Sequence, residues 1–397
     1  MIRRWIVYLL LIGSTSSFAV ELSPYAANKA LQANQLAQEE RFAEAIELLR
    51  ETKVSRGYDK AYFDRMLGVF YWQNEQLSLA IRSLTEAVGS GELVDEQGWA
   101  TRRMLADLLL MDQQYQSALP HYYQLVKEVI KDGNEKQTTS ELWLRISQVH
   151  YQLQQWAKTL SSIDRYEQLT SIDEVTPLSL KLGAQLQLER WQPAILTLKR
   201  LIALESDKSS WWLQLVSLEL RTGQPKEALS SLGLAKLHGI ELNQQELRLL
   251  AQLYAQNEIP ERAAQILGSI DNADSDLDLI TERASYWQRA KEWDRAIETW
   301  SLAAQFDAKY YWNVSLLYNQ QGEYRQALSA LDKVTDKARQ PEVALARARA
   351  LYKLNRLDDA LAQAKRAQHL QPSNNEAQGW INYLTQLREI NSRHQAS

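Results

Sequence analysis

Residues 322–334 read GEYRQALSALDKV, and nearly the same phrase occurs twice more in the chain. Upstream, residues 291–303 read KEWDRAIETWSLA, and downstream, residues 355–367 read NRLDDALAQAKRA. In each phrase an apolar residue lies three positions before an alanine, and apolar residues follow four and seven positions after it. Because a sequence repeats a phrase when it repeats a structural unit, the period of this phrase predicts the fold.

The alanine of this phrase serves as an anchor for counting repeats along the chain. The anchors are Ala45, Ala80, Ala118, Thr159 in the same slot, Ala194, Ala228, Ala263, Ala296, Ala327 and Ala360. Their spacings are 35, 38, 41, 35, 34, 35, 33, 31 and 33 residues. A period near 34 predicts an all-α chain of about ten helix–turn–helix repeats.

Other positions keep the same register. Leu67-Gly68-x-x-Tyr71 precedes Ala80, and Pro372 follows Ala360 by twelve residues. With these motifs, residues 26–372 resemble the tetratricopeptide repeat (TPR) family. The resemblance implies a TPR solenoid, in which a small anchor lets two helices cross closely and neighbouring repeats share a core.

Three local features refine this prediction. The 41-residue spacing contains KDGNEKQTTS, residues 131–140, which predicts a long loop where the stack either bends or divides. Gly183 lies eleven rather than twelve residues before its anchor, which suggests a shortened turn. Beyond Pro372, apolar residues at helical spacing from Trp380 to Leu387 predict a capping helix, within a last segment of residues 373–397.

Composition narrows the functional classes. The 397 residues are 45% apolar, so the chain can bury a large core. The formal net charge of −4 offers no general basic field for nucleic acid. The absence of cysteine excludes disulfides, thiolate metal sites and a cysteine nucleophile.

The N-terminus reads as a secretory signal peptide over residues 1–19. Arg3 and Arg4 precede a nine-residue apolar core, and Ser17-Phe18-Ala19 supplies a small-residue cleavage site. We therefore expect cleavage before Val20, a solenoid over residues 20–372 and no transmembrane segment in the mature chain. In a Gram-negative cell the mature protein would be periplasmic.

No motif predicts catalysis. The five histidines form no His-x-x-x-His pair, and no Gly-rich phosphate loop or nucleophile elbow occurs. The acidic stretch DNADSDLD, residues 271–278, lacks the glycine and the bidentate glutamate of a calcium loop. We expect it to be a loop that caps a helix starting near Leu277, and we predict no catalytic residue, metal site or cofactor.

Charge is unevenly distributed along the chain. Residues 256–307 hold eleven acidic and five basic residues, whereas residues 332–370 hold five acidic and nine basic residues. This asymmetry suits electrostatically selective protein partners, although solvated helix faces would also explain it.

The TPR resemblance also implies candidate partner-binding residues. In TPR proteins the concave surface is lined by the first helix of each repeat, at positions fifteen and eleven before the anchor. Carried onto this chain, these positions give five candidates, which are Arg65, Arg103, Arg248, Trp312 and Arg349. Arg and Trp are over-represented among interface hot spots.

A closer resemblance bears on the biological role. The phrases MLGVFYWQ (66–73), MLADLLL (104–110), ALPHYYQLV (118–126) and KLGAQLQL (181–188) look like exported TPR proteins encoded beside TonB–ExbB–ExbD clusters. That resemblance implies a periplasmic adaptor that assists a TonB-dependent outer-membrane uptake system. The alternatives are an assembly factor for outer-membrane proteins, pili or polysaccharide export, and a glycan-binding protein or enzyme.

Overall fold

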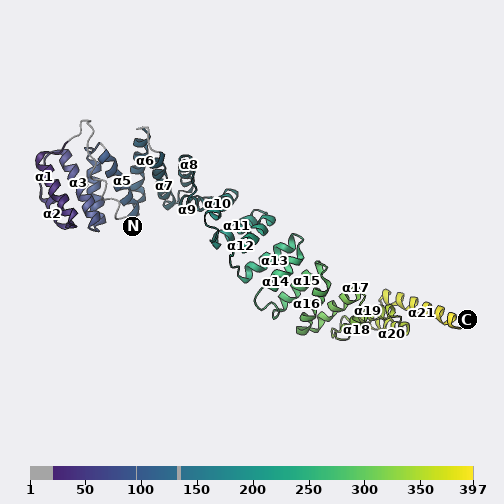
Figure 1. Cartoon of the computed structure of the whole chain (residues 1–397). Helices are drawn as coiled ribbons and strands as arrows, with labels where there is room; N and C mark the ends of the chain where they lie inside the picture. Colours follow the sequence, from purple (N-terminus) through teal and green to yellow (C-terminus); the bar gives the residue numbers. More distant parts are fainter. Residues whose placement is uncertain (1–20, 95, 132–135, 397) are drawn as a thin grey trace. The chain divides into compact units, whose positions relative to one another are not determined.

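The chain folds into helical hairpins. The computed structural model describes residues 21–94, 96–131 and 136–396, so the signal peptide predicted at 1–19 and its cleavage site lie outside the described residues. Within those ranges there are twenty-one α-helices and no β-strand, and consecutive helices lie side by side as hairpins (Figure 1). The predicted all-α fold of repeated hairpins is confirmed. No described helix combines the length and the hydropathy needed to cross a membrane.

The chain divides into two compact units, Met1–Leu204 and Glu205–Ser397. Unit 1 contains five hairpins. Their helices are α1 (Pro24–Gln38), α2 (Phe42–Glu51), α3 (Gly57–Gln73), α4 (Leu77–Gly89), α5 (Glu96–Met111), α6 (Tyr115–Lys131), α7 (Lys136–Gln152), α8 (Trp156–Leu169), α9 (Val175–Gln187) and α10 (Trp191–Leu204). Each helix packs against the next, and one hydrophobic core runs from α1 to α7.

Unit 2 contains five further hairpins and a final helix. Its helices are α11 (Ser209–Arg221), α12 (Pro225–Leu237), α13 (Gln244–Gln256), α14 (Pro260–Gly268), α15 (Leu277–Arg289), α16 (Trp293–Phe306), α17 (Tyr311–Gln321), α18 (Tyr324–Asp332), α19 (Gln340–Lys353), α20 (Leu357–Leu370) and α21 (Asn375–Ala396). A short 3-10 turn, η3 (Ala308–Tyr310), precedes α17. Pro225 and Pro260 occupy the first turn of their helices, where a missing N–H is tolerated.

The anchors lie where the two helices of each hairpin cross. All ten, from Ala45 to Ala360 and including Thr159, are 0% exposed. Close crossing also needs a small residue on the opposite helix. A Cβ added to Gly68 on α3 would lie 2.5 Å from Cγ of the buried Leu84 on α4. The repeat register taken from the sequence is therefore the packing register of the hairpins.

The turns inside the hairpins share one left-handed residue and one backbone hydrogen bond. In every hairpin the residue five before the anchor has positive φ, and these residues are Glu40, Glu75, Gln113, Gln154, Glu189, Gly223, Glu258, Lys291, Gly322 and Asn355. In each, the next residue donates its N–H to the carbonyl nine before the anchor, as Arg356 does to Leu351 at 2.9 Å. These bonds close the first helix with the left-handed C-terminal motif.

Two local predictions are corrected by these turns and helix bounds. The turn before Ala194 is not shortened, because Glu189 takes the same place as its equivalents. Gly183 instead makes room for the preceding hairpin, since a Cβ there would lie 2.5 Å from the Tyr151 hydroxyl oxygen. The loop predicted over residues 131–140 is helical at Lys131 and over 136–140, which leaves only residues 132–135, outside the described ranges.

The final helix, α21, closes the end of unit 2. It packs on α20, and its Leu384 is 1% exposed within a cluster that also contains Trp380 and Ile381. The predicted capping helix is thus present, with its apolar residues facing the last hairpin.

Candidate functional site

The first helix of each hairpin presents a repeated surface. We call these first helices A helices, the second ones B helices, and the positions fifteen, eleven, eight and seven before each anchor the A-face. Contacts at these positions reach from one A helix to the next. In unit 2 the hydroxyls of Tyr352 on α19 and Tyr383 on α21 lie 2.8 Å apart, and Arg289 on α15 donates to the Ala255 carbonyl on α13 at 3.1 Å.

In unit 1 the A-face charges pair with their neighbours. Arg103 on α5 forms a 2.7 Å ion pair with Glu141 on α7, and Asp107 lies 3.8 Å from Arg145. The partners are four residues apart on both helices, so the two pairs form successive rungs between α5 and α7. The Arg103 guanidinium also lies 5.5 Å from the Trp99 ring centroid. The Arg103 guanidinium is therefore largely used in contacts within the chain, which join two hairpins.

Arg65, the other candidate in unit 1, lies half-buried on α3. Its guanidinium lies 5.7 Å from the Tyr62 ring centroid, within the range of a cation–π interaction. Among the described residues it makes no ion pair. Arg65 therefore keeps its charge available on the A-face.

In unit 2 the three candidates differ in their surroundings. Arg248 on α13 is exposed. Trp312 on α17 packs against a cluster of Leu331, Val334, Val343 and Ala346, so much of its ring belongs to the core. Arg349 on α19 is exposed and forms an ion pair with Glu376 on α21.

The five candidates are thus distributed along the A helices, and in the described chain no contact joins any two of them. The sequence reasoning used only two A-face positions and missed Arg221, Arg289 and Lys353, which lie seven before their anchors. The same repeat register, extended to that position, would have found them.

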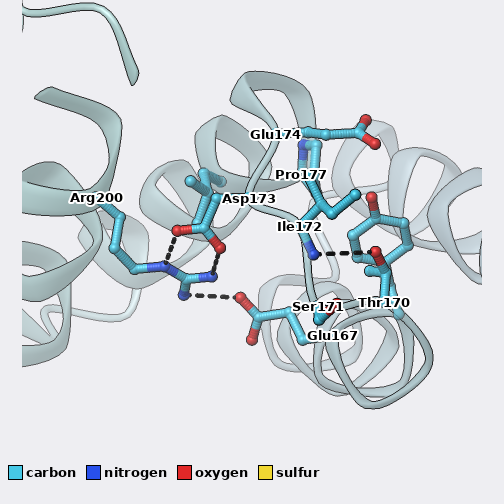
Figure 2. Close-up of a pocket in the computed structure, with 10 residues that line it drawn as sticks. Glu167, Thr170, Ser171, Ile172, Asp173, Glu174, Pro177 and Arg200 are labelled. Atoms are coloured by element: carbon cyan, nitrogen blue, oxygen red, sulfur yellow. Dashed lines mark hydrogen bonds and ion pairs between the residues drawn. The ribbon is translucent and has the colours of Figure 1, made fainter. Parts of the chain in front are cut away.

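A separate hollow of about 230 Å³ lies where α8 leads into α9 (Figure 2). Arg200 from α10 enters it and meets Asp173 of the connecting loop through two hydrogen bonds, at 2.9 and 2.6 Å. Its third nitrogen donates to Glu167 at the end of α8 at 2.8 Å. Lys181 of α9 reaches the other oxygen of Glu167 at 2.5 Å.

The charges of this hollow are committed to one another. The hydrogen bond from Arg200 lowers the pKa of Asp173, and the same bond raises the pKa of Arg200. An arginine held by two carboxylates has few donors left for a ligand, and Glu167 accepts from two cations. The arrangement fixes the α8–α9 connection against α10.

The acidic stretch 271–278 behaves as the sequence predicted. The Asp276 carboxylate accepts from the N–H groups of Asp278 and Leu279 at 2.9 and 3.2 Å and so caps α15. Asp274 pairs with Arg283 at 2.5 Å. Across the described ranges no group of three or more His, Asp or Glu side chains is arranged to hold a metal ion.

Comparison with known proteins agrees with this fold. Residues 315–375, which span α18, α19 and α20, match the family model of the tetratricopeptide repeat. None of the curated proteins matches the chain.

Several solved structures are similar. A tetratricopeptide repeat protein from Parabacteroides merdae has 13% identity and a TM-score of 0.29, over 62% of this chain and 98% of that one. The C-terminal part of a TPR repeat-containing protein from Cytophaga hutchinsonii has 14% identity and a TM-score of 0.38, over 70% of this chain and 95% of that one. At these identities the likeness concerns the fold alone.

Proposed function

We propose that this chain of TPR-like hairpins is a non-enzymatic scaffold, which binds protein partners along its A-face in the periplasm. One observation carries the proposal, namely that exposed polar side chains recur at the same position of successive A helices, as Arg221, Gln256 and Arg289 do seven residues before their anchors. A surface built from repeats offers a long, graded contact rather than one enclosed site. Proteins built of TPR repeats generally mediate protein–protein interactions.

The hollow beside α8 supports the non-enzymatic part of the proposal. Three of its charged groups, Arg200, Asp173 and Glu167, already satisfy one another. An active site needs charged groups left for a substrate, at a pKa suited to proton transfer. A structural ion-pair network accounts for this hollow more simply.

The cellular role is proposed from the sequence. The signal peptide read at residues 1–19 supports export, and the resemblance to proteins encoded beside TonB–ExbB–ExbD clusters supports an accessory role in TonB-dependent uptake. Assembly of outer-membrane proteins, pili or polysaccharide exporters is the second role for the same scaffold.

Crosslinking in the cell tests the scaffold and its partner. A photo-crosslinking amino acid replaces the exposed Gln252 on the A-face of α13, and a matched variant carries it at the exposed Ser329 on the B helix α18. We expect protein adducts from position 252 and few from position 329, identified by mass spectrometry. TonB, ExbB or ExbD among them would support the uptake role, and assembly components would support the second role.

Equal adducts at both positions, or none at position 252, would contradict binding along the A-face. N-terminal sequencing of the protein from a periplasmic extract tests export separately. A mature N-terminus at Val20 is expected, and an intact Met1 in the cytoplasmic fraction would contradict it.

A further inference from the structure

The charged residues on the A-face of unit 2 are all basic. Its twenty A-face positions contain five cations and no acid, and the cations are Arg221, Arg248, Arg289, Arg349 and Lys353. Residues 205–397 as a whole hold 25 acidic and 23 basic residues. The A-face of unit 2 therefore carries a positive net charge, whereas unit 2 as a whole carries a slightly negative net charge.

The five cations differ in how far the fold already uses them. Arg289 donates to the Ala255 carbonyl, and Arg349 pairs with Glu376. Arg248 and Lys353 are exposed and make no ion pair or side-chain hydrogen bond within the described chain. Lys353 only approaches the Tyr352 ring, at 5.9 Å. The A-face of unit 2 therefore carries two cations that bond to other residues, Arg289 and Arg349. It also carries two uncommitted cations, Arg248 and Lys353, which make no such bond within the described chain.

The acids of unit 2 lie elsewhere. In the acidic stretch 256–307, most exposed carboxylates lie on the B helices and in the connections, as do Glu261, Asp294 and Glu298. The exposed Asp278 lies in the first turn of the A helix α15, outside the A-face positions. A polyanion that covers several faces, as a nucleic acid does, would meet these carboxylates. A single narrow acidic chain that follows the A-face would meet fewer of them.

We infer that the A-face of unit 2 receives an extended acidic segment of a partner protein, a conclusion that rests on the proposed function and specifies the partner. Guanidinium and ammonium groups pair with its carboxylates. Two exposed amides on the same surface, Gln252 and Gln256, offer donors and acceptors to its peptide groups.

A direct binding measurement tests this inference on the full-length chain. The probe is a fluorescein-labelled 20-residue peptide of alternating Glu and Ser, followed by fluorescence anisotropy at low and high salt. We expect the peptide to bind, and to bind more weakly as salt screens the exposed charges. The double variant Arg248→Glu/Lys353→Glu should bind about tenfold more weakly, because it reverses the two uncommitted charges.

The matched control reverses two exposed bases on B helices, Lys226→Glu/Arg325→Glu, with the same change in net charge. We expect it to bind within about twofold of the unaltered chain. The inference is overturned if the acidic peptide does not bind at low salt, if both double variants bind alike, or if a 20-nucleotide oligothymidylate binds more tightly than the peptide. Circular dichroism of each variant checks that it is folded.

The scaffold proposal and the acidic-partner inference can be contradicted independently. If position 252 crosslinks to proteins in the cell but the acidic peptide does not bind, the scaffold stands and the acidic partner is wrong. If the peptide binds but no protein crosslinks at position 252, the charged surface stands and the scaffold role is contradicted.

Discussion

At the scale of single residues, the left-handed turns show how the fold overrides local preference. Seven of the ten positive-φ residues inside the hairpins are Glu, Gln or Lys, such as Glu258 at φ 62°. A residue with a Cβ in this conformation costs about 1–2 kcal/mol. The turn persists because it joins two helices whose packing is worth more than this strain.

Replacing Glu258 with glycine should therefore stabilise the protein. Removal of the strain outweighs the added freedom of the unfolded chain, so we expect the free energy of unfolding to rise by about 0.5–1 kcal/mol. Glu298→Gly, on the exposed face of α16, should lower it by about 1 kcal/mol. Chemical denaturation measures both, and a loss of stability in Glu258→Gly would contradict the strain argument.

His150 is a buried polar residue nine positions before its anchor, a slot that seven of the other nine hairpins fill with an aromatic or aliphatic side chain. Its Nε2 lies 2.8 Å from the Tyr123 hydroxyl and its Nδ1 lies 2.9 Å from the Gln155 amide oxygen. Burial lowers the pKa of His150, the hydrogen bond that its Nδ1–H donates to the Gln155 amide oxygen opposes this, and the positive charge of Lys158 lowers the pKa further. The folded chain therefore prefers the neutral ring.

This preference predicts that acid destabilises the chain through His150. An unfolded histidine has a pKa of about 6.5, so the unfolded state binds more protons below that pH. The stabilising contribution is complete above about pH 6.5 and is lost as the pH falls toward the lower folded-state pKa. Thermal melts at pH 7.5 and 5.5 should show a smaller fall in Tm for His150→Gln than for the unaltered chain. The exposed His369→Gln is the control, and an equal fall in Tm in all three proteins would rule out this role.

At the scale of helices, stability comes from close crossings inside each hairpin. The crossing of α3 and α4 depends on Gly68, because Leu84 fills the space that a side chain would occupy. Leu84 is 0% exposed and cannot move aside without disturbing its neighbours.

Gly68→Ala should consequently destabilise the protein, by about 1–3 kcal/mol, the usual cost of overpacking a core. Gly379 on α21 has nothing within 4 Å of its missing Cβ, so Gly379→Ala should raise stability by up to about 1 kcal/mol through helix propensity. Urea denaturation compares the two, and the same sign for both would argue against a steric role for Gly68.

Neighbouring A helices are joined more weakly, by the rungs between α5 and α7. Arg103 and Glu141 are 33% and 47% exposed, so their 2.7 Å pair is partly screened by solvent. A double-mutant cycle with Arg103→Ala and Glu141→Ala should give a coupling free energy of about 0.5 kcal/mol. A coupling free energy of zero would mean that the Arg103–Glu141 ion pair does not stabilise the contact between the two hairpins.

At the scale of the whole molecule, the chain divides into its two units between Leu204 and Glu205. Residues 205–208 connect α10 to α11 and are exposed. Each unit has core clusters of its own.

Brief digestion should therefore cut first inside residues 205–208, where Glu205 and Lys208 offer sites for Glu-C and trypsin. We expect two fragments that correspond to the two units and resist further digestion, identified by intact-mass measurement. First cuts inside 131–140 would instead support the hinge that the sequence predicts there.

The sequence by itself determined the hairpin register of this protein. Ten anchors at a period near 34 predicted the helices and the buried small residues such as Ala45, and the apolar spacing from Trp380 to Leu387 predicted the capping helix. The reason is that each hairpin uses the same short-range contacts, so the pattern is repeated enough to be read without a structure.

The tertiary structure alone decided which distant side chains meet. Arg103 donates a hydrogen bond to Glu141, which lies 38 residues away in the sequence, and Arg200 donates one to Asp173. Gly183 lacks a side chain where Tyr151 packs. Such pairings depend on the distance between helices and on side-chain rotamers, and neither of these produces a repeating pattern in the sequence. The left-handed turns could not be predicted from the sequence for a related reason. Packing of the two helices imposes a backbone conformation that glutamate does not prefer by itself.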